Sequence, residues 1–563
     1  MLRCFRGKNP FFFLCVNVFF LPIINWHLIL IDSNDDCLGS CFGSTSPKII
    51  PYYNILWAEQ IEHNNSSQVI IVKIFYADQT GKLTLSPETI TVKFIVNNDL
   101  TSPILFQPQP IPELEPTLGR TSADSMNDLL PKDGAKGSAS VAGTVEDGSI
   151  VATILNRAYA NTKRNKHFLV LINPKGGPGK GEQIYKTICA PFLSMARCQT
   201  TVIVTTHRYH ALEIARDTPD IKKYDAVICC SGDGTPHEFI NGLAKRQGDA
   251  REALAKLALC QLPCGSGNSV ANSINGNSSP TMASLGMVKG VPIPVDLMLI
   301  TQDDGQYLSF LSQTFGIIAD ADLGTEHLRW MGGTRFVYGV LKYTLQGKEY
   351  PCDIYIKYSH ETPNAIKNHY IQSLQQHHDN IGTASTATLS SKVDYDQPSA
   401  PSSSTSGNSS HEEDTDLLTP RFGTVNDPVP ADWVKIPDTD SLSIMYCGKM
   451  PWVSSDCMMF PATLPTDGTM DIFITNTNQM SRPQAIRMLA GMETGTHIEH
   501  DFIEYSKAEA YRLVPRGGSS SKGNLSFDGE QFPCHPFQVE LLPALGCLLT
   551  NNGTWTLTGF DRR

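Results

Sequence analysis

The sequence lacks the excess of positive charge that a nucleic-acid-binding protein needs. Its 563 residues include 45 Lys and Arg against 56 Asp and Glu, a formal net charge of −11 at pH 7. Because such proteins bind phosphate backbones through a basic face, nucleic acid is not expected as a partner. The 15 cysteines contain no CxxC pair and no regular framework. Reduced thiols, and therefore a cytosolic location, are expected.

The first 31 residues lack the small-residue cleavage site of a signal peptide. Residues 11–21 and 23–31 are almost entirely apolar and together approach membrane-spanning length, although Pro22 would kink a helix between them. Three interpretations stay open for this stretch: a membrane anchor, a pair of buried strands, or a wrongly assigned start of the chain.

Changes in composition divide the chain into segments. Residues 49–100 contain β-branched runs with turn signals between them, which predicts a small β-rich domain. A stretch rich in Pro, Ser, Gly and Asp follows, and its composition predicts a disordered linker. Strands then alternate with helices, which predicts a parallel sheet, before short strands take over. The expected segments are 1–48, 49–100, 101–160, 161–305 and 306–563, the last with a polar, disordered insertion at about 361–432.

Four apolar strands of the α/β segment run into polar or glycine-rich loops at their carboxyl ends. This is the edge at which open α/β sheets bind ligands. The first loop, residues 173–181, has four glycines together with Lys175 and Lys180, and such a loop before a helix is suited to an anion. It is not a Walker A loop, because no Lys-Ser/Thr pair follows the last glycine.

Two more loops repeat this pattern. Residues 231–234 read Ser-Gly-Asp-Gly, and residues 265–268 read Gly-Ser-Gly-Asn. Each alone is compatible with an ordinary turn. On successive strand ends of one sheet they converge with the first loop and predict a phosphate site. In a kinase, a carboxylate such as Asp233 would take the proton of the attacking hydroxyl or position a metal.

Residues 312–335 carry a further cluster of charges. Asp320 and Asp322 are expected on one face of an extended segment, and Arg329 and Arg335 follow. Surface ion pairs are the ordinary explanation of such a pattern. Between the phosphate loops and the β-rich segment, however, the two guanidinium groups would suit a transferring phosphoryl group.

In their order, these motifs resemble those of a sphingosine kinase, more specifically a fungal-type sphingoid long-chain-base kinase of the diacylglycerol-kinase-like lipid kinase superfamily. The matching stretches are VLINPKGGPGKG (170–181), TTHRYHA (205–211), SGDGTPHEFINGL (231–243), LPCGSGNSVANS (262–273), residues 312–335 and FDGE (527–530). Residues 50–58 also resemble the fungal members. The resemblance departs from the family at Pro178, where a basic residue is usual, and at Lys175, where arginine is frequent.

The resemblance implies an N-terminal α/β nucleotide-binding lobe with a parallel sheet and a C-terminal β-sandwich that encloses the lipid, beside the small β-rich region. It implies that Asp233 is the general base and that catalysis uses ATP and Mg²⁺. Ser312 and Asp322 would hold the polar head of the lipid, Arg329 and Arg335 would reach the phosphates, and Glu530 would lie near the nucleoside. The remaining implied contacts with ATP are Asn173, Lys175, Gly176, Gly177, Thr205, Ser231, Gly232, Gly234, Gly265, Ser266 and Gly267.

The predicted substrate is thus a sphingoid long-chain base, phosphorylated on its primary hydroxyl. A diacylglycerol or ceramide kinase, a kinase of a soluble substrate such as NAD, and a catalytically inactive lipid-binding module are the alternatives. Asp322 favours the sphingoid base, since only this lipid carries an ammonium group. Because the substrate resides in membranes, peripheral attachment to a cytoplasmic membrane face is expected. Cys37 and Cys41 resemble acylation sites that could supply it, although unmodified surface cysteines remain the alternative.

Overall fold

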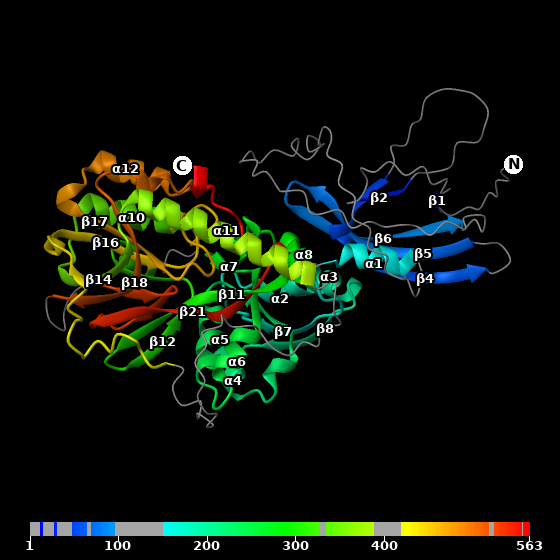
Figure 1. The fold of residues 1–563 in the computed structure, drawn as a ribbon, viewed down its shortest axis with the longest axis horizontal. Coiled ribbons are helices and arrows are strands. Elements are labelled where there is room, and N and C mark those ends of the chain that lie inside the picture. The colour runs from blue at the N-terminus through cyan, green and yellow to red at the C-terminus, as the bar shows by residue number, and fades with distance from the viewer. Residues whose placement is uncertain are drawn as a thin grey trace. The chain divides into compact units, whose positions relative to one another are not determined.

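The computed structural model describes residues 12–14, 27–30, 48–64, 69–95, 150–160, 162–325, 334–387, 418–516, 523–553 and 555–562. They form two compact units (Figure 1). The first comprises residues 1–165 with 188–199, and the second comprises residues 166–187 with 200–563.

The first unit is built on a four-stranded sheet with the order β1 (Phe12–Leu14), β6 (Thr84–Ile95), β5 (Val69–Gly81) and β4 (Ile55–Asn64). Strands β4 to β6 are antiparallel, and alternate residues such as Val72, Ile74 and Tyr76 are buried on one face. Helix α1 (Ile150–Ala158) packs on β4, and α3 (Ala190–Met195) packs on β4 and β6. The expected β-rich N-terminal region is therefore confirmed.

Two short strands lie within the apolar start of the chain. Phe12–Leu14 pairs with β6, and β2 (His27–Leu30) pairs with β3 (Lys48–Pro51). Over the described parts of the chain, no helix is both long and apolar enough to cross a membrane. The other residues of the first 31, as well as Cys37 and Cys41, lie outside the described residues.

The second unit begins with an α/β lobe. Its strands have the order β8 (Gln199–Val204), β7 (His167–Ile172), β9 (Ala226–Ser231) and β10 (Ala258–Pro263), and β9 is parallel to both of its neighbours. Strands β9 and β10 are buried along their whole length, as expected for a parallel sheet covered on both faces. The covering helices are α2 (Gly181–Ile184), α4 (His210–Asp217), α5 (Gly234–Ala244), α6 (Ala250–Lys256), α7 (Ser269–Asn275) and α8 (Pro280–Lys289).

A β-rich lobe completes the second unit. Its main strands follow the order β20 (Glu530–Phe532), β19 (Leu525–Phe527), β13 (Ser312–Gly316), β16 (Leu442–Gly448), β17 (Met470–Asn476), β18 (Glu504–Pro515) and β21 (Phe537–Thr550). The other elements are β11 (Val291–Gln302), β12 (Gly305–Ser309), β14 (Cys352–His360), β15 (Val434–Lys435), α9 (Ile317–Gly324), α10 (Thr334–Gln346), α11 (Pro363–Ala387) and α12 (Arg482–Gly491). The predicted combination of an α/β lobe and a β-rich lobe is confirmed.

Strand β21 joins the two lobes into one sheet. It pairs in parallel with β10 through Leu548 and Leu259, and antiparallel with β11 and β18. Figure 1 shows β11 and β21 between the strands of the two lobes. The lobe boundary expected at residues 305–306 falls inside β12, which forms a hairpin with β11.

Two expectations about the β-rich half are wrong. Asp320 and Asp322 lie on helix α9, whereas an extended segment was expected. Helix α11 occupies much of the insertion that was expected to be disordered, and its Ile366 and Tyr370 are buried in the hydrophobic core of the lobe. These apolar side chains recur at helical spacing within a polar sequence, so they suffice to anchor one face of the helix. Residues 388–417 of the insertion lie outside the described residues.

A buried network of charges ties several strands of the β-rich lobe together. Lys507 Nζ lies 2.7 Å from Asp467 Oδ2 and 2.6 Å from Asp471 Oδ1. Lys449 Nζ pairs with Asp467 and lies 2.9 Å from Asp296 Oδ2. The two lysines hold the pKa of Asp467 well below its usual value despite burial. Each of these charges therefore depends on its partners to remain ionised inside the protein.

Candidate active site

Three glycine-bearing loops meet at the carboxyl ends of β7, β9 and β10. A Cβ atom at Gly177, where φ is +54°, would lie 2.4 Å from the carbonyl oxygen of Cys264. A Cβ atom at Gly265 would lie 2.3 Å from the Cα atom of Gly232. Only glycine permits such close backbone contacts, so the loops expected to converge do converge.

Asp233 lies at this meeting point, directly before helix α5. Its Oδ1 accepts hydrogen bonds from Gln261 Nε2 at 3.1 Å and from Ser269 N at 2.9 Å, and its Oδ2 accepts one from Ser269 Oγ at 3.0 Å. Burial raises the pKa of Asp233 to about 6, although the three hydrogen bonds act in the opposite direction. The carboxylate is thus ionised at neutral pH and is a stronger base than an exposed aspartate.

The other residues expected to contact ATP surround this carboxylate. Asn173, Lys175, Gly176 and Gly177 belong to the loop after β7, where Asn173 Oδ1 accepts a hydrogen bond from the Lys175 backbone at 3.0 Å. The side chain of Lys175 is exposed and can reach a ligand from the loop.

Thr205 follows β8, and its hydroxyl and amide both donate to the carbonyl of Ile172. Ser231 ends β9 and is buried, whereas Ser266 is exposed on the loop after β10. The structure brings these residues to one edge of the sheet. Their individual contacts with a nucleotide stay predictions.

Glu530 reaches this edge from the β-rich lobe. A Cβ atom at Gly234 would lie 2.6 Å from Glu530 Oε1, which explains the second glycine of the Ser-Gly-Asp-Gly motif. Glu530 Oε2 lies 3.2 Å from Arg208 Nη2 of the loop after β8. Glu530 is therefore placed beside the start of α5, and its expected contact with the nucleoside stays a prediction.

Ser312 and Asp322 lie beside a tyrosine that the sequence interpretation missed. Tyr446 on β16 is buried and hydrogen-bonded to Ser312, and the charges of Asp322 and Asp233 add to burial in raising the pKa of its phenol. Asp322 is only half-buried. Tyr446 therefore lies close enough to Ser312, Asp322 and Asp233 to be influenced by all three.

The neighbouring acid Asp320 has a structural role. It is buried and accepts hydrogen bonds from Tyr350 Oη at 2.6 Å and from the backbone and side chain of Asn524, each at 3.0 Å, and it pairs with Lys348. Asp320 thus fastens α9 to the β-rich lobe, whereas Asp322, two residues further along the helix, lies near Tyr446.

Asp528 is a second residue whose place the sequence interpretation missed. It lies in the turn between β19 and β20, is buried, and accepts hydrogen bonds from Ser309 Oγ at 2.6 Å, from the Ser312 backbone at 2.9 Å and from His237 Nδ1 at 2.8 Å. His237 lies one turn after Asp233 on α5. Asp528 thus joins the helix of the predicted base to the strand of the predicted head-group site. The motif FDGE was its only signal in the sequence.

Arg329 and Arg335 are the two remaining predicted phosphate ligands. Arg329 lies outside the described residues, and Arg335 belongs to α10 without a described side chain. Their roles stay predictions.

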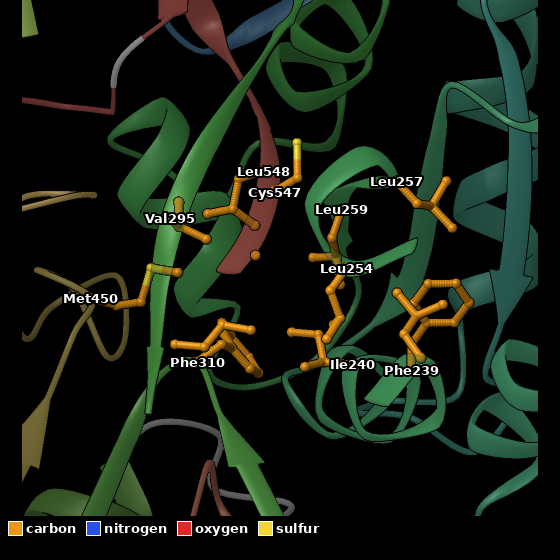
Figure 2. A pocket seen from close by; sticks show the side chains of 13 residues that line it. Phe239, Ile240, Leu254, Leu257, Leu259, Val295, Phe310, Met450, Cys547 and Leu548 are labelled. Atoms are coloured by element: carbon orange, nitrogen blue, oxygen red, sulfur yellow. The ribbon is translucent and has the colours of Figure 1, made fainter. Parts of the chain in front are cut away.

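An apolar cavity lies deeper between α5, α6, β10, β11 and β21. Its volume is about 20 Å³, and its lining includes Phe239, Leu259, Phe310 and Leu548 (Figure 2). None of its lining residues belongs to the glycine loops. At this volume the cavity has room for little more than a water molecule, and its lining is almost entirely apolar.

Two family models match the two lobes of the second unit. Residues 167–300 match the family model described as "Diacylglycerol kinase catalytic domain", and residues 442–549 match the "YegS C-terminal NAD kinase beta sandwich-like domain". A solved structure of a diacylglycerol kinase from Bacillus anthracis str. Sterne covers 69% of this chain and 99% of its own, with 18% identity and a TM-score of 0.44.

Three relatives of known family show a more specific similarity. Sphingoid long chain base kinase 5 of Saccharomyces cerevisiae is 38% identical over 74% of this chain and 64% of its own length. Sphingoid long chain base kinase 4 of Schizosaccharomyces pombe is 31% identical over 70% of this chain and 78% of its own. Sphingosine kinase 1 of Homo sapiens is 28% identical over 67% of this chain and 88% of its own. The chain belongs to the family of sphingoid long-chain base kinases, as its motifs predicted.

Proposed function

We propose that this protein transfers the γ-phosphoryl group of ATP to the primary hydroxyl of a sphingoid long-chain base. The observation that carries the proposal is the Asp233 carboxylate, which lies where three glycine loops meet and has a pKa of about 6. The substrate hydroxyl gives its proton to Asp233 while its oxygen attacks the γ-phosphorus. The bond from that phosphorus to the β–γ bridging oxygen breaks, and ADP leaves.

The nucleotide would lie across the strand ends of the α/β lobe. Backbone amides of the glycine loops, with Lys175 and Lys180, offer donors and positive charge to its phosphates. Among the residues described by the structure, no three His, Cys, Asp or Glu side chains gather as a metal cage. Mg²⁺ is commonly held by one or two carboxylates and the substrate phosphates, and ATP would supply the phosphates here. Bound in this way, the ion would neutralise charge on the phosphates.

The head group would bind between the two lobes of the second unit. Asp322 would pair with the ammonium of the base, and Ser312 and Tyr446 would hold its hydroxyl groups. Ceramide and diacylglycerol have no ammonium group, so the carboxylate would be left without its partner in their complexes.

The deciding experiment is a competition assay with the full chain and labelled ATP. A sphingoid base, ceramide and diacylglycerol are offered together in mixed micelles, and the labelled lipids are separated. Label is expected in the base alone. Equal labelling of diacylglycerol would contradict the proposed specificity, and no labelled lipid at all would contradict the proposed activity.

We further propose that the enzyme works at the cytoplasmic face of a membrane. Its substrate resides in bilayers, so the active site must meet their surface. One acyl chain gives only marginal membrane binding, and two signals are needed for a stable anchor. Cys37 and Cys41 together could supply two chains.

A further inference from the structure

The carboxylate of Asp233 has a nearly complete set of hydrogen-bond donors before any substrate binds. An ionised carboxylate offers about four lone pairs, two on each oxygen. Gln261 Nε2 and Ser269 N occupy those of Oδ1, at 3.1 and 2.9 Å, and Ser269 Oγ occupies one of Oδ2, at 3.0 Å. One lone pair of Oδ2 is left. A Cβ atom at residue 267 would lie 2.5 Å from Oδ2, so Gly267 keeps the space beside this oxygen open.

The amide of Gln261 is held in one orientation. Gln261 is buried in β10, and its Oε1 accepts a hydrogen bond from the backbone of Ala271 at 3.0 Å. A backbone N–H can only donate, so the oxygen of the amide must face Ala271 and its nitrogen must face Asp233. Gln261 therefore cannot turn an acceptor toward the carboxylate, and its donor stays in place throughout a reaction.

The hydroxyl of Ser269 has a choice that Gln261 lacks. Its Oγ lies 3.0 Å from Asp233 Oδ2 and 2.9 Å from the carbonyl oxygen of Val453, and Ser269 is fully buried. A hydroxyl has one proton and can donate to only one of these acceptors at a time. While Asp233 is ionised, donation to its carboxylate is the stronger bond because the acceptor is charged. Once Asp233 is protonated, its oxygens are weaker acceptors, so donation from the hydroxyl to Val453 competes more favourably.

We propose that Gln261 and Ser269 are positioning residues for the general base, with Oδ2 of Asp233 as the oxygen that takes the substrate proton. The inference rests on the proposed function. In the step, the substrate O–H bond breaks and the Oδ2–H bond forms at the lone pair of Oδ2 that Ser269 leaves open, while Ser269 Oγ can keep donating to the other lone pair of that oxygen. The two residues need not touch the substrate to act in this way.

Other charges around Asp233 also affect its proton affinity. The charged and titratable groups on the elements packed around it include His237, Cys264, Asp322, Tyr446, Asp528 and Glu530. Asp528 adds to burial in raising the pKa of Asp233, whereas the hydrogen bonds from Gln261 and Ser269 lower it. Gln261 and Ser269 thus lower the pKa of Asp233 through hydrogen bonds to its carboxylate, and neither side chain is itself ionisable.

The test measures kcat/KM for the sphingoid base from about pH 5 to about pH 9, because this quantity reports the pKa of the free enzyme's base. Ser269→Ala and Gln261→Met each remove a donor to the carboxylate. In both variants the acidic limb should move to higher pH by about one unit, the size of one charge-assisted hydrogen bond. Activity should recover at pH values well above the shifted limb. At a pH on the limb, kcat should fall more than the KM for ATP changes.

Ser273→Ala is the matched control. Ser273 lies one turn further along α7 and is fully buried, and within the described residues its hydroxyl has no hydrogen-bond partner. Its pH profile should superimpose on that of the wild type. If Ser269→Ala also superimposes, or loses activity equally at every pH, the positioning role is wrong.

The outcomes separate this inference from the proposed function. A wild-type enzyme without lipid kinase activity would contradict the function itself. An active wild type with unshifted variants would contradict only the inference. Thermal unfolding checks that each variant is folded. If Gln261→Met is not folded, the pH profile of Ser269→Ala alone tests the inference. Ser269→Cys carries a weaker donor of similar size, so its acidic limb should move in the same direction by a smaller amount.

Discussion

Replacing Asp233 by asparagine should remove the base and leave the fold intact. The amide fits the existing donors in one orientation. Its oxygen can take the place of Oδ1 and accept from Gln261 Nε2 and Ser269 N, which lie 3.1 and 2.9 Å from that atom. Its nitrogen then donates to Ser269 Oγ, which in turn donates to the carbonyl of Val453, 2.9 Å away. Every polar atom of the substituted side chain therefore finds a partner.

The size of the effect follows from the chemistry that is lost. General-base assistance contributes roughly a hundred- to ten-thousandfold to the rate. At about 1.4 kcal/mol for each factor of ten, this corresponds to about 3–5 kcal/mol of transition-state stabilisation. We expect kcat of Asp233→Asn to fall within this range, and the affinity for ATP to change little.

The same substitution should stabilise the fold at neutral pH. Burial raises the pKa of Asp233 from 3.8 to about 6, so the ionised carboxylate is less stable in the folded state than in the unfolded chain. Above pH 6 this difference costs at most about 3 kcal/mol, and below the unfolded pKa it disappears. Asp233→Asn should therefore unfold at a higher temperature than the wild type near pH 8, and this advantage should vanish near pH 4.

The assay combines turnover with a nucleotide-dependent thermal shift on the same preparation. Asp456→Asn is the matched control, because Asp456 is an exposed aspartate near Val453 whose carboxylate accepts from Ser454 Oγ at 2.7 Å. It should keep near-wild-type turnover. Wild-type turnover in a folded Asp233→Asn enzyme would refute the assignment of the base. Loss of its ATP-induced thermal shift would place Asp233 in nucleotide binding instead.

Four further predictions concern other parts of the molecule. Asp322→Asn should raise the KM for the sphingoid base more than the KM for ATP, through loss of a charge-assisted hydrogen bond of about 1.5–3 kcal/mol. Lys507→Met should lower the free energy of unfolding by about 3–5 kcal/mol in a denaturant titration, because it takes from buried Asp471 its lysine and from buried Asp467 one of two. Replacing residues 388–417 by a short Gly-Ser linker should leave kcat unchanged, because so polar a sequence contributes little to a core. Replacing Cys37 and Cys41 together by serine should move the protein to the soluble fraction in cell fractionation, with unchanged activity on detergent-dispersed substrate.

Each of these has a result that would contradict it. A rise in the KM for ATP alone would assign Asp322 to the nucleotide site, and an unchanged denaturation midpoint for Lys507→Met would mean that the network is dispensable. A linker variant that no longer folds would show that residues 388–417 contribute to the core. If the double cysteine variant stays on membranes until residues 1–31 are removed, the apolar start is the anchor and acylation is not.

The sequence by itself determined the α/β lobe and the β-rich lobe, and it pointed to Asp233 as the predicted base. Parallel strands buried on both faces read as continuous apolar runs, and glycines mark the loops that follow them, so these features are local. Asp233 lies between two such glycines and could be found in the same way. The same local rules failed at residues 363–387, because a few apolar side chains such as Ile366 and Tyr370 anchor α11 within a polar stretch.

Only the tertiary structure decided what surrounds the base. Gln261 and Ser269 lie 28 and 36 residues from Asp233, and Asp528 lies 216 residues from Ser312, whose backbone it binds. It also decided that Asp320 is a structural residue while Asp322, two positions away, lies beside Tyr446. Hydrogen bonds depend on the distance and direction between atoms, and over such separations these are set by how strands and helices pack. No periodicity or spacing along the chain records them.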